Sequence, residues 1–180
     1  MRRLIVSLTV ALLTLGTVAG VASATHSNGQ GPDKDFTNGS TKGPVVTPFG
    51  TFPSQSHINA QNQGPLAGNT TGSFFLRIFT PTGEVALTGD VQCLTAVGNS
   101  SVNIGIITTM TGAFGPFPEG SLINFRILAR NDDNGEGSQD PPDASGGNLL
   151  PPGPTPVTCP FFPIATTPQP QGNVTVHDGI

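Results

Sequence analysis

The chain has 180 residues and carries 7 Lys and Arg against 11 Asp and Glu, a formal net charge of −4 at pH 7. Its basic residues are scattered, whereas nucleic acids and anionic membranes are bound by clustered Lys and Arg, so the composition argues against both partners. The 24 Gly and 18 Pro residues are spread among runs rich in Val, Ile, Phe and Thr. This mixture indicates an all-β domain with many turns and long loops.

Residues 1–24 have the pattern of a secretory signal peptide. Arg2 and Arg3 form a positive n-region, residues 4–22 form a mostly apolar h-region, and Ala22-Ser23-Ala24 is a small-residue cleavage site. Cleavage after residue 24 predicts an exported protein, secreted or held at the cell surface, with no membrane span in the mature chain. An uncleaved membrane anchor is the alternative, but the apolar stretch is short and interrupted by Ser and Thr.

The mature chain is expected to begin with an arm and continue as one domain. Residues 25–53 are rich in Gly, Pro, Asn and Thr and lack sustained periodicity, which predicts a flexible arm in which Val45 and Val46 could add a short edge strand. Residues 54–180 are expected to form a single all-β domain. Its first two strands are predicted over residues 55–61 and 72–80, and the second is apolar on both faces, as a central strand would be.

The stretch from Glu84 to Met110 predicts the central hairpin, because it has the longest run of β-favouring residues and a tight-turn signal at Gly98-Asn99-Ser100. Two-residue alternation divides its side chains into a packed face and a polar face. Val85, Leu87, Val91, Cys93, Thr95 and Val97 fall on the packed face, and Asp90 and Gln92 fall on the polar face.

The rest of the chain predicts further strands around that hairpin. A loop is expected over residues 111–120, a strand over 121–130, a long acidic Pro- and Gly-rich loop over 131–154, and a closing strand over 172–177. An antiparallel meander of six to eight strands can protect its edges by curling into a closed or partly closed β-barrel, with the last strand returning beside the first. A β-sandwich is the alternative fold.

The chain contains two cysteines, Cys93 and Cys159. An even pair in an exported protein predicts one disulfide, and two buried free thiols are the alternative. The spacing excludes a CxxC redox pair, and the lack of further cysteines excludes a cysteine zinc site.

Four stretches together resemble an uncharacterised family of small secreted proteins of high-GC Gram-positive and related bacteria. They are I-N-A-Q-x-x-G-P-L-A-G-N-T-T-G-S-F, G-D-V-Q-C-L-T-A-V-G-N-S-S-V-N-I-G, N-D-D-N-G-E-G-S-Q-D-P-P-D and G-N-V-T-V-H-D. The resemblance covers about residues 55–178 and implies export, a β domain and pairing of the two cysteines. It implies no active site and no substrate.

The acidic loop partly matches a calcium-binding loop. Oxygen-bearing side chains recur in it at spacings that suit a hard cation, namely those of Asp132, Asn134, Glu136, Asp140 and Asp143. The last position holds Asp instead of the usual bidentate Glu, and the flanks do not look helical. The pattern therefore raises the hypothesis of a calcium site in this loop. A solvated acidic turn is the alternative.

A second candidate site is the polar face of the predicted sheet. If that face forms the inside of a barrel, a polar cavity would be lined by Arg77, Asp90, Gln92, Asn124 and Arg126. Phe114, Phe117, Phe161 and Phe162 could form its mouth or plug the barrel ends. An ordinary ion pair between Asp90 and Arg126 is the alternative.

Catalytic signatures are weak. The sequence has no nucleophile-elbow, zinc-protease or P-loop motif. His57 and His177 fall on the first and last predicted strands and could pair for acid–base or metal chemistry, or be ordinary polar strand residues. The absence of Trp and Tyr leaves only Phe for stacking on sugars, which weakens a carbohydrate-binding interpretation.

Three functions remain open. The first is a secreted, non-enzymatic binding module that contacts a cell-surface or extracellular component. The second is a barrel that binds a small molecule in its lumen, with or without lyase or isomerase chemistry. The third is a surface module stabilised by calcium.

Overall fold

The computed structural model describes residues 34–62, 69–135, 141–154, 159 and 164–179. In this part of the chain the backbone forms nine antiparallel strands and no α-helix. The strands are β1 (Asp35–Thr47), β2 (Gly50–Asn62), β3 (Thr70–Thr80), β4 (Gly83–Val97), β5 (Ser100–Thr111), β6 (Arg126–Asp132), β7 (Ala144–Leu150), β8 (Thr167–Pro168) and β9 (Gln171–His177).

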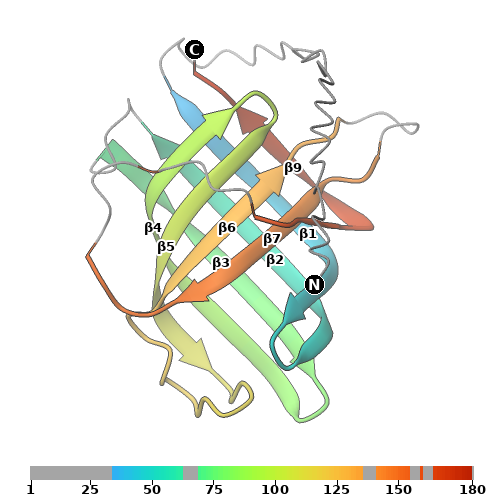
Figure 1. The fold of residues 1–180 in the computed structure, drawn as a ribbon, viewed down its shortest axis with the longest axis vertical. Coiled ribbons are helices and arrows are strands. Elements are labelled where there is room, and N and C mark those ends of the chain that lie inside the picture. The colour runs from blue at the N-terminus through green and yellow to red at the C-terminus, as the bar shows by residue number, and fades with distance from the viewer. Residues whose placement is uncertain (1–33, 63–68, 136–140, 155–158, 160–163, 180) are drawn as a thin grey trace, which may run out of the picture.

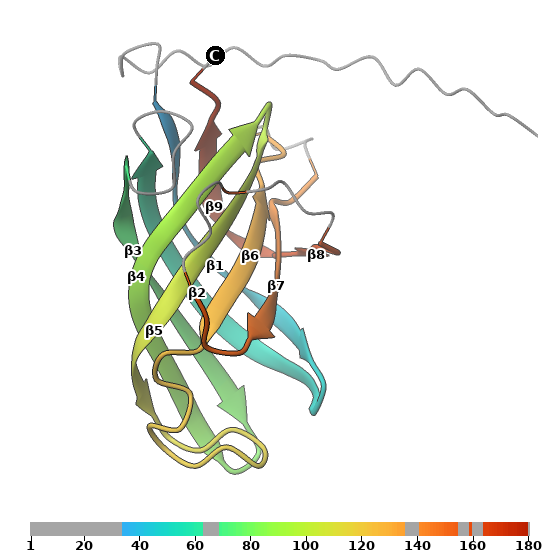
Figure 2. The same ribbon diagram turned by 60° about the vertical axis from the view of Figure 1, so that its left-hand side comes forward.

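The strands form one sheet in the order β8-β7-β6-β5-β4-β3-β2-β1-β9. Figures 1 and 2 show this sheet curled into a partly closed barrel, as the sequence predicts. The last strand does return to the start of the sheet, but it pairs with β1 and not with the strand that contains residues 55–61. Pairing with β9 covers the edge of β1, which would otherwise offer unpaired backbone groups.

The prediction of a flexible arm over residues 25–53 is wrong from residue 35 onward. β1 pairs with β2 along its whole length, from Asp35 opposite Asn62 to Thr47 opposite Gly50. On its other side β1 also pairs with β9. The segment has low strand propensity, and it is a strand because both neighbours satisfy its backbone. Residues 25–33 lie outside the described part of the chain.

Two other boundaries also differ from the prediction. Residues 121–124 form turns, and β6 begins only at Arg126 because Asn124 adopts a positive φ of 71° that ends the extended conformation. The long acidic loop predicted over residues 131–154 contains β7, which pairs with β6 from Asp132 opposite Ala144 to Arg126 opposite Leu150.

β4 and β5 form the expected hairpin, and Gly98 supplies a φ of 60° at its tight turn. The alternation of side chains along β4 is interrupted by a β-bulge, because Val91 faces Gly105 while Cys93 faces the very next residue, Ile104. The bulge shifts the side-chain alternation by one residue. Val91 and Leu94 therefore face the interior, and the prediction that Val91 and Cys93 share one face is wrong.

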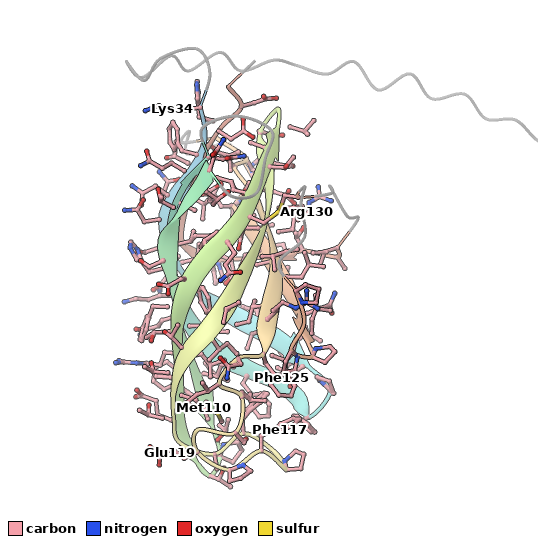
Figure 3. All side chains as sticks on the ribbon, turned by 90° about the vertical axis from the view of Figure 1, so that its left-hand side faces the viewer. Lys34, Met110, Phe117, Glu119, Phe125 and Arg130 are labelled. Atoms are coloured by element: carbon pink, nitrogen blue, oxygen red, sulfur yellow. A yellow bond between two sulfur atoms is a disulfide. The ribbon has the colours of Figure 1, made fainter. Side chains whose placement is uncertain are left out.

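Two groups of apolar side chains lie inside the barrel, together with buried polar residues that include Thr37, Asn62, Ser101 and Asn103. The larger group lies toward the end with the 112–125 loop and includes Ile78, Val85, Leu87, Ile107, Met110, Phe114 and Leu122. The smaller group contains Ile58, Ala60, Val91 and Leu94, and the ring of Phe74 packs against both groups. Figure 3 places Met110, Phe117 and Phe125 toward one end of the barrel and Lys34 at the other.

A third apolar cluster lies outside the barrel wall. Cys93, Val102, Ile104 and Leu128 point outward from β4, β5 and β6 and are covered by Cys159 and Ile164. The predicted disulfide is present between Cys93 and Cys159, whose Cα atoms are 5.3 Å apart. The hydroxyl of Thr95 donates to the carbonyl of Cys159 at 2.8 Å. Cys159 and Ile164 therefore cover this side of the sheet from outside.

Candidate functional site

The structure corrects the placement of the side chains predicted to line a lumen. Asp90 is exposed and lies opposite Ser73 and Ile106, while its neighbour Val91 is buried in the core. Asp90 and Arg126 share one face with Ile106 between them, so they sit two strands apart.

The other predicted lumen residues also lie away from the interior. Arg77 forms an ion pair with Glu84 at 2.8 Å, both side chains being well exposed. Arg126 donates to the carbonyls of Pro151 and Pro154 at 3.2 and 2.8 Å. Asn124 is an exposed loop residue, and Gln92 lies at the bulge. Phe114 and Phe117 close the apolar end of the barrel, and Phe161 and Phe162 lie outside the described residues.

The described residues of the acidic loop are engaged in hydrogen bonds within the protein. Asp132 accepts from Arg130, Ser100 and Thr166 at 2.7–2.9 Å. Asp143 is buried and accepts from the backbone N–H groups of Asn134 at 3.0 Å and Val174 at 2.6 Å.

These bonds leave the calcium hypothesis without structural support. The side chain of Asn134 donates to the carbonyl of Pro142, and Glu136 and Asp140 lie outside the described residues. Within the described ranges, no group of three or more His, Cys, Asp or Glu side chains is close enough together to hold a metal ion.

The two strand histidines are separated by β1. His57 bonds through Nδ1 to the hydroxyl of Ser40 at 2.8 Å, whereas the ring of His177 stacks on Phe36 with the centroids 5.1 Å apart. In the register, Ser40 lies opposite His57 and Phe36 lies opposite His177. The two imidazoles therefore do not form a pair.

An array of polar side chains lies on the outside of β9, β1, β2 and β3. Residues directly opposite each other in neighbouring strands point to the same face, so the register groups these side chains into three rows. The rows are Thr175–Asn38–Asn59–Ser73, Asn173–Ser40–His57–Phe75 and Gln171–Lys42–Gln55–Arg77. We call these twelve residues the polar face.

A shallow groove runs through the middle of the polar face. It is lined by Ser40, Thr41, Lys42, Gln55, Ser56, His57, Phe75, Gln171 and Gly172. The guanidinium of Arg77 lies over the ring of Phe75, 5.4 Å from its centroid, and also forms the ion pair with Glu84. The amides of Gln55 and Gln171, the hydroxyl of Ser40 and one aromatic ring therefore meet in one place, whereas Thr41 and Ser56 hydrogen-bond to each other on the inner face.

The groove differs in charge from the rest of the molecule. Its lining contains one cation, Lys42, and no carboxylate, although the whole chain is acidic. The pair of Ser40 and His57 is exposed, and no acidic side chain in the lining orients the imidazole. A serine activated as a nucleophile needs a histidine that is oriented by a third group and partly desolvated, and the Ser40–His57 pair lacks both features. The arrangement suits ligand binding through hydrogen bonds instead.

Sequence reasoning missed this site because it assigned part of it to an arm. Asn38, Ser40 and Lys42 belong to β1, and they reach the polar face only because β1 lies between β2 and β9. The available signal was their two-residue spacing, which is the period of a strand with one exposed face.

Comparisons with protein-family models, with curated proteins and with solved structures found no match to this chain. In the part of the chain that the structure describes, no helix is long and apolar enough to span a membrane. A disulfide with both cysteines buried is compatible with an extracellular protein.

Proposed function

We propose that this chain is a secreted, non-enzymatic binding module whose polar face contacts a component of the cell surface or the extracellular medium. The observation that carries the proposal is the groove in the centre of that face, where hydrogen-bonding side chains from β1, β2 and β9 converge beside Phe75. Surface side chains spread singly over a protein need no explanation, but convergent polar groups in a concave site favour ligand binding.

The positions of the predicted lumen residues argue for the outer face over the lumen. Ile78, Leu94 and Ile107 are buried in the barrel, and the side chains predicted to line a lumen lie outside it. The signal-peptide pattern and the disulfide support export, because disulfides persist in oxidising compartments.

The test measures binding of the labelled mature chain to whole bacterial cells and to purified cell envelopes. Replacing Gln55 and His57 together by Ala should reduce the bound fraction several-fold, since both side chains line the groove. The matched control is Asn148→Ala, an exposed strand residue on β7, which should bind like the unchanged protein. Equal binding by all three proteins, each shown to be folded by thermal melting, would refute the assignment of this face.

A further inference from the structure

The chemistry of the groove indicates what kind of ligand it binds, if the proposed function is correct. We infer that the ligand is a polysaccharide that carries carboxylate groups. The inference depends on three properties: the extent of the polar face, the hydrogen-bonding groups that line the groove, and Lys42, the one cation in that lining.

The extent of the polar face suits an extended polymer. Each of its rows crosses β9, β1, β2 and β3, and neighbouring strands lie about 4.8 Å apart, so a row of four side chains spans roughly 14 Å. Such a row can contact several successive units of a chain laid across the strands.

The hydrogen-bonding groups suit a ligand rich in hydroxyls. Gln55 and Gln171 each offer an amide that can both donate and accept, and the hydroxyl of Ser40, which is bonded to His57, keeps a further hydrogen-bonding position. A sugar hydroxyl also donates and accepts, so either orientation of each partner can be satisfied. Phe75 is the one aromatic side chain of the lining, and the guanidinium of Arg77 lies over its ring.

The single cation points to a carboxylate. Lys42 is the one charged residue in the groove lining, whereas the charge of Arg77 beside it is already paired with Glu84. A carboxylate on the ligand would therefore find Lys42 without meeting a competing acid in the groove. Attraction by Lys42 acts within about 8 Å at physiological salt, so it acts locally despite the acidic charge of the whole chain.

Other macromolecules fit this face less well. An extended peptide typically adds to a sheet edge or inserts side chains into apolar pockets, and this groove lies on the face of the sheet beside one aromatic ring. A nucleic acid needs several clustered cations along its backbone, and the lining holds only Lys42.

The experiment compares two probes that differ mainly in charge. Calorimetric titration of the mature chain with oligogalacturonate, whose units carry carboxylates, is compared with titration by neutral galactan oligosaccharides of the same length. We expect the acidic probe to bind more tightly, and we expect its affinity to fall as sodium chloride rises from 50 to 500 mM.

Two matched variants locate the charge effect. Lys42→Gln should weaken binding of the acidic probe about three- to fivefold, the size expected for one solvent-exposed ion pair, and should leave binding of the neutral probe unchanged. Lys34→Gln removes a cation at the far end of the barrel and should change neither affinity. Both variants should keep the melting temperature of the unchanged protein.

The outcomes separate this inference from the proposed function. Equal affinity for both probes, or equal effects of the two Lys variants, would overturn the assignment of Lys42 to a carboxylate. Binding to cell envelopes that depends on Gln55 and His57 without binding to either oligosaccharide would overturn the polysaccharide inference and leave the proposed function standing. If the chain bound neither cell envelopes nor either oligosaccharide, the proposed function and the polysaccharide inference would both be refuted.

Discussion

Phe74 shows how single residues shape the interior of this barrel. Its side chain points inward from β3 and packs against both groups of core residues. The ring lies over Gly89 and Gly105, where an added Cβ would come within 2.6 and 2.4 Å of ring carbons. Glycine at these two positions leaves the space that the ring occupies.

At residue scale, we expect Gly105→Ala to lower the free energy of unfolding by about 1–3 kcal/mol, the usual cost of overpacking a core. Gly105 has no positive φ, so backbone strain makes no contribution. The measurement is urea denaturation followed by circular dichroism.

A double-mutant cycle provides the control. In a Phe74→Leu background the smaller side chain should make room for the methyl group, so the cost of Gly105→Ala should shrink or change sign, because Ala restricts the unfolded chain. The same cost in both backgrounds would show that the ring is not the cause.

At the scale of elements, β9 is held on its two sides in different ways. A regular ladder joins it to β1, whereas its other edge donates backbone N–H groups to carboxylates. Val174 donates to Asp143 at 2.6 Å, and Val176 donates to Asp133 at 3.2 Å. Carboxylates of the acidic loop therefore accept hydrogen bonds from the backbone N–H groups on the edge of β9 that pairs with none of the described strands.

Carboxylates also join other strand ends at the same end of the barrel. Asp35 accepts from the backbone N–H groups of Ala96 and Gly179, and Asp178 accepts from that of Gly98. Figure 1 shows the start of β1, the β4–β5 turn and the C-terminus together at this end.

We expect Asp143→Ala to lower the free energy of unfolding by about 2–4 kcal/mol, because it leaves the buried N–H of Val174 and the half-buried N–H of Asn134 without their charged acceptor. Asp143→Asn keeps one carbonyl oxygen and should cost less. Chemical denaturation measures both, and hydrogen exchange should show faster exchange at the Val174 amide.

The matched control is Asp90→Ala, which removes an exposed carboxylate from the outside of β4 and should change stability by less than about 0.5 kcal/mol. If Asp143→Ala were as mild as this control, the carboxylate would not be needed to hold β9.

At the scale of the whole molecule, the disulfide joins the barrel wall to the layer outside it. Cys93 and Cys159 are 66 residues apart in the sequence, and both are buried in the outer cluster with Val102, Ile104 and Leu128. The cross-link therefore closes a long loop that includes β5, β6 and β7.

Replacing both cysteines by Ala should lower the free energy of unfolding by about 4 kcal/mol on the chain-entropy account, because the unfolded chain regains the freedom that the long loop had lost. Ala avoids burying an unpaired hydroxyl in the outer cluster. Denaturation midpoints of the unchanged protein with and without reductant give an independent estimate. If the variant and the oxidised protein had equal midpoints, the disulfide would not contribute to stability.

The candidate site was only partly accessible from the sequence. His57, Gln55 and Phe75 fall within predicted strands, and the alternation there correctly separates outward from inward side chains. Ser40 and Lys42 fall in the segment predicted as an arm, so the groove could not be assembled from local patterns. The lumen hypothesis failed because Asp90 and Arg77 lie on the convex side of the sheet, and alternation alone does not say which face of a sheet becomes the interior.

The sequence by itself determined the all-β class, the hairpin of β4 and β5 with its turn at Gly98, and a barrel-like meander, because these depend on local alternation and turn chemistry. Only the tertiary structure decided that residues 35–47 form a strand, that the bulge before Cys93 turns its side chain outward, and that Asp143 holds the edge of β9. These features depend on pairing between segments far apart in the chain, and strand formation responds more to such neighbours than to intrinsic preference.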